Sequence, residues 1–284
     1  MTSAGRPDDR GVLVLVGTPI GNLGDLAPRA VDALAGADVI CCEDTRRTGR
    51  LLQHAGVARR TMLTVNDHTE AAAIADVVSR LGRGQRVAVV TDAGMPGISD
   101  PGERLVRAAS ADGHRVEVVP GPSAAITALV ASGLPTGRFV FEGFLPRKGS
   151  GRSARLAEVA GERRTTVLYE APHRLARTIA DLAAACGSER RVVLGRELTK
   201  LHEEVWRGTL GQALDRLDEV EPRGEHVIVL DAAPEPDTAT DEDIVAAVGQ
   251  ARAAGATTRD AAASVAGELG VSKRRVYDLA VRRG

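Results

Sequence analysis

The sequence predicts an α/β protein with two α/β domains, a cleft between them and a small helical region at the C-terminal end. Short apolar runs alternate with helical patterns through most of the chain, which is typical of sheets covered by helices. A segment rich in proline and acidic residues, 232–240, has the composition of a linker. Three short helical patterns without strands follow it, so the C-terminal region is expected to be helical.

The first domain is predicted over residues 11–121. Its strands are continuous apolar runs and the segments between them have helical periodicity, so we expect a mostly parallel sheet covered on both faces. The predicted strands are 12–16, 38–42, 62–65, 86–90 and 115–119. The predicted helices are 27–34, 45–54, 70–81 and 103–111.

The second domain is predicted over residues 122–233. Its first helix, 123–131, ends at a glycine–proline stop, and Pro172 favours the start of a later helix. No helical pattern separates the strands at 191–197 and 204–210, so we expect a mixed sheet. The other predicted strands are 138–144, 165–170 and 226–230, and the other predicted helices are 153–162, 172–185 and 212–219.

The C-terminal region is predicted over residues 238–284, with helices at 241–253, 258–269 and 272–281. Gly270 ends one helix and Ser272 caps the next, which begins with Lys273, Arg274 and Arg275. This layout is typical of a helix-turn-helix with basic side chains at the start of its second helix. A helical cap packed on an enzyme explains the same pattern equally well.

Composition narrows the class of protein. Charged residues make up 26% of the chain, no apolar run approaches the roughly 20 residues that cross a membrane, and the first ten residues are polar, so we expect a cytoplasmic protein. The three cysteines are predicted to be reduced, with Cys41 and Cys42 buried in a strand, and no metal site is expected. The net charge is −1, but basic residues, almost all arginines, occur in local clusters that could bind phosphate. Solvated helix faces are the alternative.

Two loops rich in glycine follow predicted strands. The segment 90–102 reads VTDAGMPGISDPG, and the segment 120–129 begins PGPSA. A strand that ends in small residues gives a ligand close access to its backbone, at the sheet edge where α/β proteins bind small molecules. We therefore expect a small-molecule cleft; ordinary glycine turns are the alternative.

Clusters of polar residues lie at the ends of other predicted strands. Glu43 and Asp44 close one strand, and Thr45 is expected to cap the helix that follows. Glu170 closes another, and Arg147 and Lys148 lie in a basic, glycine-bounded loop suited to a phosphate backbone. A capped helix whose charges pair locally is the alternative for Glu43 and Asp44. No signature of a serine, cysteine or zinc hydrolase is present in the sequence.

Seven motifs between Thr18 and Glu204 occur in an order that resembles the tetrapyrrole methylase superfamily and, within it, the methyltransferases of small-subunit ribosomal RNA. They are TPIGNLGDL, CEDTR, DAGMPGISDPG, PGPSA, FLPRKG, YEAPHR and RELTKLHEE. The resemblance implies a homodimer of two-domain subunits that uses S-adenosylmethionine, bound in the cleft, to methylate the ribose 2′-oxygen of a decoding-centre cytidine in 16S rRNA.

The resemblance also assigns expected roles to residues of this sequence. Glu43, Asp44 and Glu170 are candidates for the group that takes the hydroxyl proton, without a choice among them. Arg46, Arg47, Arg147 and Lys148 are expected to hold the RNA of the small ribosomal subunit. The donor is expected to contact Pro19, Asp92, Ala93, Gly94, Ser123, Thr127, Ala128 and Ala171, largely through backbone groups.

Two other functions remain open at this point. The first is a tetrapyrrole C-methyltransferase acting on a precorrin or porphyrin, although the basic loop and the C-terminal helices favour RNA. The second is a regulator that binds nucleic acid through its C-terminal helices and uses the α/β body as a ligand sensor.

Overall fold

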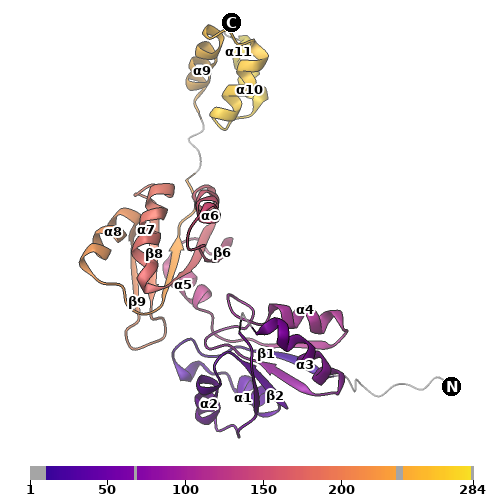
Figure 1. The fold of residues 1–284 in the computed structure, drawn as a ribbon. Helices are drawn as coiled ribbons and strands as arrows, with labels where there is room; N and C mark the ends of the chain where they lie inside the picture. Colours follow the sequence, from indigo (N-terminus) through magenta and orange to yellow (C-terminus); the bar gives the residue numbers. More distant parts are fainter. Residues whose placement is uncertain (1–10, 67–68, 235–238, 283–284) are drawn as a thin grey trace, which may run out of the picture. The chain divides into compact units, whose positions relative to one another are not determined.

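The computed structural model describes residues 11–66, 69–234 and 239–282 (Figure 1). The polar N-terminal segment 1–10 and the centre of the predicted linker, 235–238, lie outside the described residues. The chain divides into two compact units, Met1–Ala232 and Ala233–Gly284. The first unit therefore holds both predicted α/β domains, and the second holds the C-terminal helices.

The first sheet is entirely parallel, with the strand order β3-β2-β4-β1-β5. All its strands therefore end at the same edge, where the loops that follow them gather. The strands are β1 (Val12–Val16), β2 (Val39–Cys42), β3 (Thr61–Thr64), β4 (Arg86–Val89) and β5 (Arg115–Val119).

Helices cover both faces of this sheet, as the continuous apolar strands predict (Figure 1). Leu13 and Leu15 of β1 pack on the face covered by α3 (Glu70–Gly82) and α4 (Glu103–Ala111). Val14 and Val16 pack on the opposite face, with α1 (Pro28–Ala35) and α2 (Thr45–His54). Each buried Leu or Val side chain stabilises the fold by about 1.5–3 kcal/mol relative to exposure.

The second sheet has the order β6-β7-β10-β8-β9 and is mixed, as predicted. Only β6 and β7 run parallel; β8 and β9 form an antiparallel pair because a short loop, not a helix, joins them. One face packs on α5 (Ala124–Ser132) and the other on α6 (Ser150–Gly161), α7 (Pro172–Cys186) and α8 (Leu210–Glu219). The strands are β6 (Phe139–Phe144), β7 (Thr165–Glu170), β8 (Arg191–Arg196), β9 (Glu204–Thr209) and β10 (His226–Leu230).

The second unit is a three-helix arrangement of α9 (Asp241–Ala253), α10 (Thr258–Glu268) and α11 (Lys273–Arg282), with its own buried core. The hydroxyl of Ser272 accepts a hydrogen bond from the backbone N–H of Arg275 at 3.3 Å, so the predicted cap is confirmed. Arg275 also binds the Asp241 carboxylate at 2.7 Å, so one of the three clustered cations is held within the unit.

Some details differ from the sequence prediction. The prediction that Thr45 caps α2 is wrong, because the Asp44 carboxylate accepts the backbone N–H of Arg46 at 2.8 Å and Thr45 is already helical. Helix α6 begins at Ser150 rather than at 153, and a short 3-10 helix, Leu23–Asp25, was not predicted. Cys41 and Cys42 are buried as expected, and burial raises the pKa of Cys41 to about 12. Among the described residues, no helix combines the length and apolar character needed to cross a membrane.

Candidate functional site

Two glycines set the spacing of the loops at the edge of the first sheet. Gly17 follows β1 and Gly121 follows β5, and a Cβ added to either would lie 2.6–2.7 Å from the backbone of the other. Any side chain there would push the loops apart. A Cβ on Gly17 would also meet the Met95 sulfur at 2.7 Å, so the loop after β4 packs on the same point.

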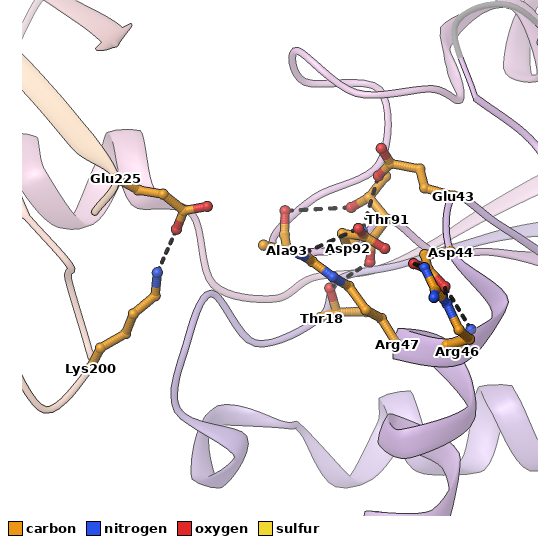
Figure 2. Close-up of polar contacts among 10 residues, drawn as sticks. All are labelled: Thr18, Glu43, Asp44, Arg46, Arg47, Thr91, Asp92, Ala93, Lys200 and Glu225. Atoms are coloured by element: carbon orange, nitrogen blue, oxygen red, sulfur yellow. Dashed lines mark hydrogen bonds and ion pairs between the residues drawn. The ribbon is translucent and has the colours of Figure 1, made fainter. Parts of the chain in front are cut away.

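The loop after β4 is fixed to the loop after β1 by a short bridge. The backbone N–H of Thr18 donates to the Gly94 carbonyl at 2.9 Å, and the Gly94 N–H donates back to Thr18 at 3.2 Å. The Thr18 hydroxyl donates to the carbonyl of Thr91 at 3.2 Å (Figure 2). Ala93 and Gly94 are therefore held in place.

Below, "the central cavity" denotes a space of about 350 Å³ lined by the loops that follow β1, β4 and β5 and by residues at the ends of β6, β7 and β10. This volume lies in the range of small-molecule sites. Most of its wall is apolar or aromatic, with a few polar groups. Its lining residues are Ile20, Ala93, Gly94, Met95, Ile98, Ser99, Asp100, Ser123, Ala124, Phe144, Tyr169, Glu170, Ala171, Pro172, Leu198, Glu225, His226 and Val227.

Aromatic packing shapes one wall of the central cavity. The Tyr169 ring meets the rings of Phe141 and Phe144 edge to face, with centroids 5.1 and 5.6 Å away. The Tyr169 hydroxyl accepts the backbone N–H of Ala125 at 3.2 Å, at the start of α5. Burial raises the pKa of Tyr169, so this hydroxyl is neutral. Tyr169 therefore ties the second sheet to the loop after β5.

A second pocket, about 250 Å³, is lined by Pro19, Arg47 and Asp92, among others; we call it the side pocket. Arg47 pairs with the Asp92 carboxylate at 3.2 Å, and Glu43 accepts the backbone N–H of Asp92 at 3.0 Å (Figure 2). The CEDTR segment and the loop after β4 therefore form one polar wall. Pro19 and Asp92 line this pocket rather than the central cavity.

Asp44 and Arg46 form a local pair on the surface. Their side chains lie 3.0 Å apart (Figure 2), and hydrogen bonds from Arg46 lower the pKa of Asp44 to about 2. A carboxylate stabilised in its charged form is a weak proton acceptor at neutral pH. Arg46 is therefore already paired with Asp44 at the start of its own helix, α2.

Glu170 is buried and fully engaged at the junction of β7 and α7. One oxygen accepts the backbone N–H of Ala171 at 2.9 Å and pairs with Arg174 at 3.1 Å. The other accepts the Thr178 hydroxyl at 2.6 Å. These contacts use both oxygens to hold the chain where Ala171 borders the central cavity.

The same buried network supports the basic loop between β6 and α6. Arg174 donates to the Leu145 carbonyl at 2.6 Å. Arg152 donates to the Pro146 carbonyl at 2.9 Å and to the Thr178 hydroxyl at 3.0 Å. Arg147 and Lys148 follow directly and are exposed, so their backbone is anchored while their side chains face solvent.

The structure gathers only part of the residues expected at the donor site. Ala93, Gly94, Ser123 and Ala171 line the central cavity together with Glu170. Thr127 and Ala128 line neither the central cavity nor the side pocket. The Thr127 hydroxyl donates to the Ser123 carbonyl at 2.8 Å, and Ala128 is buried in the core of the second sheet.

Other lining residues were missed by sequence reasoning, notably Tyr169, Glu225 and His226. Tyr169 lies in the YEAPHR motif, directly before Glu170. His226 opens an apolar strand, where a histidine reads as part of the core. Among residues 11–66, 69–234 and 239–282, no group of three or more His, Cys, Asp or Glu side chains is placed to hold a metal ion.

Comparison with known sequences identifies relatives along almost the whole chain. Residues 12–214 match the family "Tetrapyrrole (Corrin/Porphyrin) Methylases". The chain is 44% identical over 273 residues to ribosomal RNA small subunit methyltransferase I of Synechocystis sp., covering 95% of this chain and 98% of the relative. It is 42% identical over 280 residues to the protein of that name in Escherichia coli O157:H7, covering 97% and 96%.

Two solved structures of methyltransferases share this fold. The methyltransferase CobJ superposes with a TM-score of 0.60 at 21% identity, covering 79% of this chain and 95% of that structure. Uroporphyrin-III-C-methyltransferase from Thermus thermophilus gives a TM-score of 0.55 at 25% identity, covering 78% and 94%. The chain therefore belongs to the tetrapyrrole methylase family, in the branch named ribosomal RNA small subunit methyltransferase I.

Proposed function

We propose that this methyltransferase methylates the ribose 2′-oxygen of a decoding-centre cytidine in 16S rRNA, with S-adenosylmethionine as the donor. The observation that carries the proposal is the match to rRNA small subunit methyltransferases over 95–97% of the chain, C-terminal helices included. Methyltransferases of this family use S-adenosylmethionine. The two solved methyltransferases share the fold at lower identity and cover less of the chain.

The central cavity fits this donor. Its volume, about 350 Å³, and its aromatic wall suit a nucleoside, and the loop backbone at Ala93 and Gly94 lies at its edge. The Asp100 carboxylate suits a positive charge of a sulfonium amino acid, whereas the Glu225 carboxylate in the same wall already pairs with Lys200 (Figure 2). The buried Nδ1 of His226, in the same wall, has no hydrogen-bond partner among the described residues.

The chemistry leaves mainly a positioning task to the protein. When bound, S-adenosylmethionine supplies a methyl group on a positively charged sulfur that leaves readily. The protein must hold the ribose oxygen in line with that methyl, and positioning of this kind can contribute about 7–11 kcal/mol to lowering the barrier. Ala93, Gly94, Ser123 and Ala171 are proposed to hold the donor through backbone groups.

We propose Glu43 as the carboxylate that takes the hydroxyl proton. Asp44 is disfavoured because its pKa is lowered to about 2 by Arg46, and Glu170 because both its oxygens hold the β7–α7 junction. Glu43 lies at the end of β2 and contacts the backbone of Asp92, beside the loop that borders the cavity. Proton transfer of this kind contributes about 10²–10⁴-fold to a rate.

Arg147 and Lys148 are proposed to bind the RNA. Arg46 and Arg47 are proposed to bind it as well. The anchored, exposed loop supports Arg147 and Lys148 most, because a fixed backbone orders cations at little entropic cost. Arg46 and Arg47 already pair with Asp44 and Asp92, so phosphate would have to compete with those carboxylates.

A homodimer and a cytoplasmic location complete the proposal. Ile126 and Val130 lie one turn apart on α5 with 46% and 70% of their surfaces exposed, an apolar pair that a second subunit could cover. Light scattering with size-exclusion chromatography should give twice the monomer mass; a monomer mass at micromolar protein would contradict the homodimer.

One assay separates this function from the tetrapyrrole alternative. Labelled S-adenosylmethionine is offered with 30S particles that lack the modification and, separately, with a precorrin. Label should enter 16S rRNA at a ribose 2′-oxygen of a cytidine. Label in the precorrin alone would replace the proposal with the tetrapyrrole reaction.

A further inference from the structure

The outward side of α11, in the second unit, combines cations with an aromatic ring. Val276 and Ala280 of this helix are buried in the core of the unit. Arg274, Tyr277 and Val281 follow one another at helical spacing and are exposed, with 45% of the Tyr277 surface and 57% of the Val281 surface accessible. The name "α11 face" is used for Lys273, Arg274, Tyr277 and Val281.

Positive charge is concentrated on the α11 face. Within the described residues, the side chains of Lys273 and Arg274 form no ion pair or hydrogen bond, whereas the neighbouring Arg275 pairs with Asp241 at 2.7 Å. Asp278 is the one acidic residue of α11, and the acidic residues of this unit gather instead in the first turn of α9. Unpaired cations on one exposed face suit an anionic partner, and an arginine fork fits phosphate.

The Tyr277 ring adds a second kind of contact to these cations. Aromatic residues make up 2% of the chain, and only two of them are tyrosines. Tyr169 packs against Phe141 and Phe144 in the wall of the central cavity. In the part of the chain that the structure describes, the Tyr277 ring has no aromatic partner and lies outside the core of its unit. An exposed ring beside free cations is suited to stack on an unpaired RNA base while the cations hold its backbone.

The turn before α11 fixes the direction of this helix. Gly270 has φ of +64°, and the backbone N–H of Val271 donates to the Ala266 carbonyl at 3.2 Å. Ser272 then caps α11. In a helix-turn-helix the second helix meets the nucleic acid. Because the major groove of duplex RNA is too deep and narrow for side chains to read, α11 suits phosphates and unpaired bases rather than a paired sequence.

We propose that the α11 face is a second RNA contact of this methyltransferase, apart from the target nucleotide. Lys273 and Arg274 bind backbone phosphates, and the Tyr277 ring stacks on an unpaired base. This inference rests on the proposed RNA substrate. A second contact on the same chain raises the effective concentration of the RNA near the first unit. It therefore lowers KM for the RNA and leaves the methyl-transfer step unchanged.

Methyl transfer to 30S particles that lack the modification tests the stacking contact in the full-length protein. Tyr277→Ala removes the ring and should raise KM for the particles about 10-fold, because one base–aromatic stack is lost. Its kcat and donor affinity should stay within twofold of the native values. Tyr277→Phe keeps the ring and should have a KM within about twofold of native. Urea unfolding establishes that each variant is folded.

A salt series tests the cations. Arg274→Ala should reduce the slope of log affinity for the particles against log salt by about 0.7–0.9, as one phosphate contact is lost. Arg252→Ala, which removes an exposed charge in the last turn of α9, is the matched control and should leave the slope unaltered. In competition, a stem-loop RNA should displace the particles better than a DNA duplex of equal length, and Tyr277→Ala should remove that preference.

The outcomes separate this inference from the proposed function. A folded Tyr277→Ala protein with the native KM would overturn the stacking contact, and so would an equal loss in Tyr277→Phe. The same change of slope in Arg252→Ala would overturn the assignment of the phosphates to the α11 face. A halved mass of Tyr277→Ala in light scattering would assign the face to a second copy of the chain. A native protein that methylates no RNA would instead overturn the proposed function.

Discussion

Gly94 illustrates how single residues shape the site. Its φ of +86° is a left-handed conformation that glycine adopts freely and branched residues resist. A Cβ at Gly94 would meet Ile20 and the Pro122 carbonyl at 3.5 Å, an ordinary contact distance. The strain of a substitution therefore comes from the backbone conformation and not from a clash with a neighbouring atom.

Gly94→Val is expected to lose donor binding by at least about 10-fold and to lower the free energy of unfolding by about 1–3 kcal/mol. Gly133, with φ of +76° and an open surrounding, is the matched control: Gly133→Val should lose stability but keep donor affinity. Calorimetry and urea unfolding give both quantities. Unchanged donor affinity in a folded Gly94→Val protein would contradict the proposed place of the donor.

Glu43→Gln preserves an acceptor for the Asp92 backbone but cannot take a proton. We expect kcat to fall about 10²–10⁴-fold with donor affinity unchanged. Asp44→Asn is the control, because asparagine also caps helices and Asp44 is a poor base, so its kcat should stay within a few-fold of native. Equal losses in both variants would remove Glu43 from the proton-accepting role.

The sequence predicted helices and strands correctly where their apolar residues follow a regular pattern. The runs at 12–16 and 226–230 alternate between two buried faces, and the structure has strands at those bounds. The start of α6 at Ser150 was missed because Gly149, Ser150 and Gly151 have weak helical preference. The Asp44 cap was missed because Asp44 and Thr45 both favour that position and only the backbone decides between them.

The basic loop between β6 and α6 is held in place by side chains of α6 and α7. Arg152 and Arg174 fix its start through partly buried hydrogen bonds that no local sequence pattern predicts. Its exposed cations, in contrast, were predictable from the sequence. The loop should therefore act as a fixed pair of charges rather than as a flexible tail.

Lys148→Ala is expected to weaken RNA binding and to reduce the slope of log affinity against log salt by about 0.7–0.9, as one phosphate contact is lost. Donor affinity should not change. Arg83→Ala removes an equal charge beside the opposite edge of the first sheet, where β4 begins, and should leave the slope unaltered. Filter binding over a salt series checks this; an unaltered slope for Lys148→Ala would take that residue off the RNA surface.

For the whole molecule, the sequence predicted the fold class, the parallel and mixed sheets and the helical C-terminal unit. It could not predict which loops meet: the central cavity joins residues from Ile20 to Val227, brought together by tertiary packing. Thr127 and Ala128 were expected at the donor but are absent from both pocket linings. The boundary at 121/122 between the first two domains stays a prediction, since the compact units divide at Ala232.

Deletion of residues 238–284 tests the alternative of a nucleic-acid-binding regulator. The first unit has its own cores, so the truncated protein should fold, bind donor and retain methyl transfer, with weaker RNA binding if the helices contact RNA. Methyl transfer to 30S particles and donor calorimetry measure this. Loss of all activity with donor binding intact would favour the regulator.

The location of the donor is tested most directly by a crystal structure with S-adenosylmethionine bound. The donor should lie in the central cavity, against the backbone of Ala93 and Gly94 and beside Tyr169 and His226. A donor seated in the side pocket or elsewhere, with the central cavity closed by side chains, would contradict the assignment.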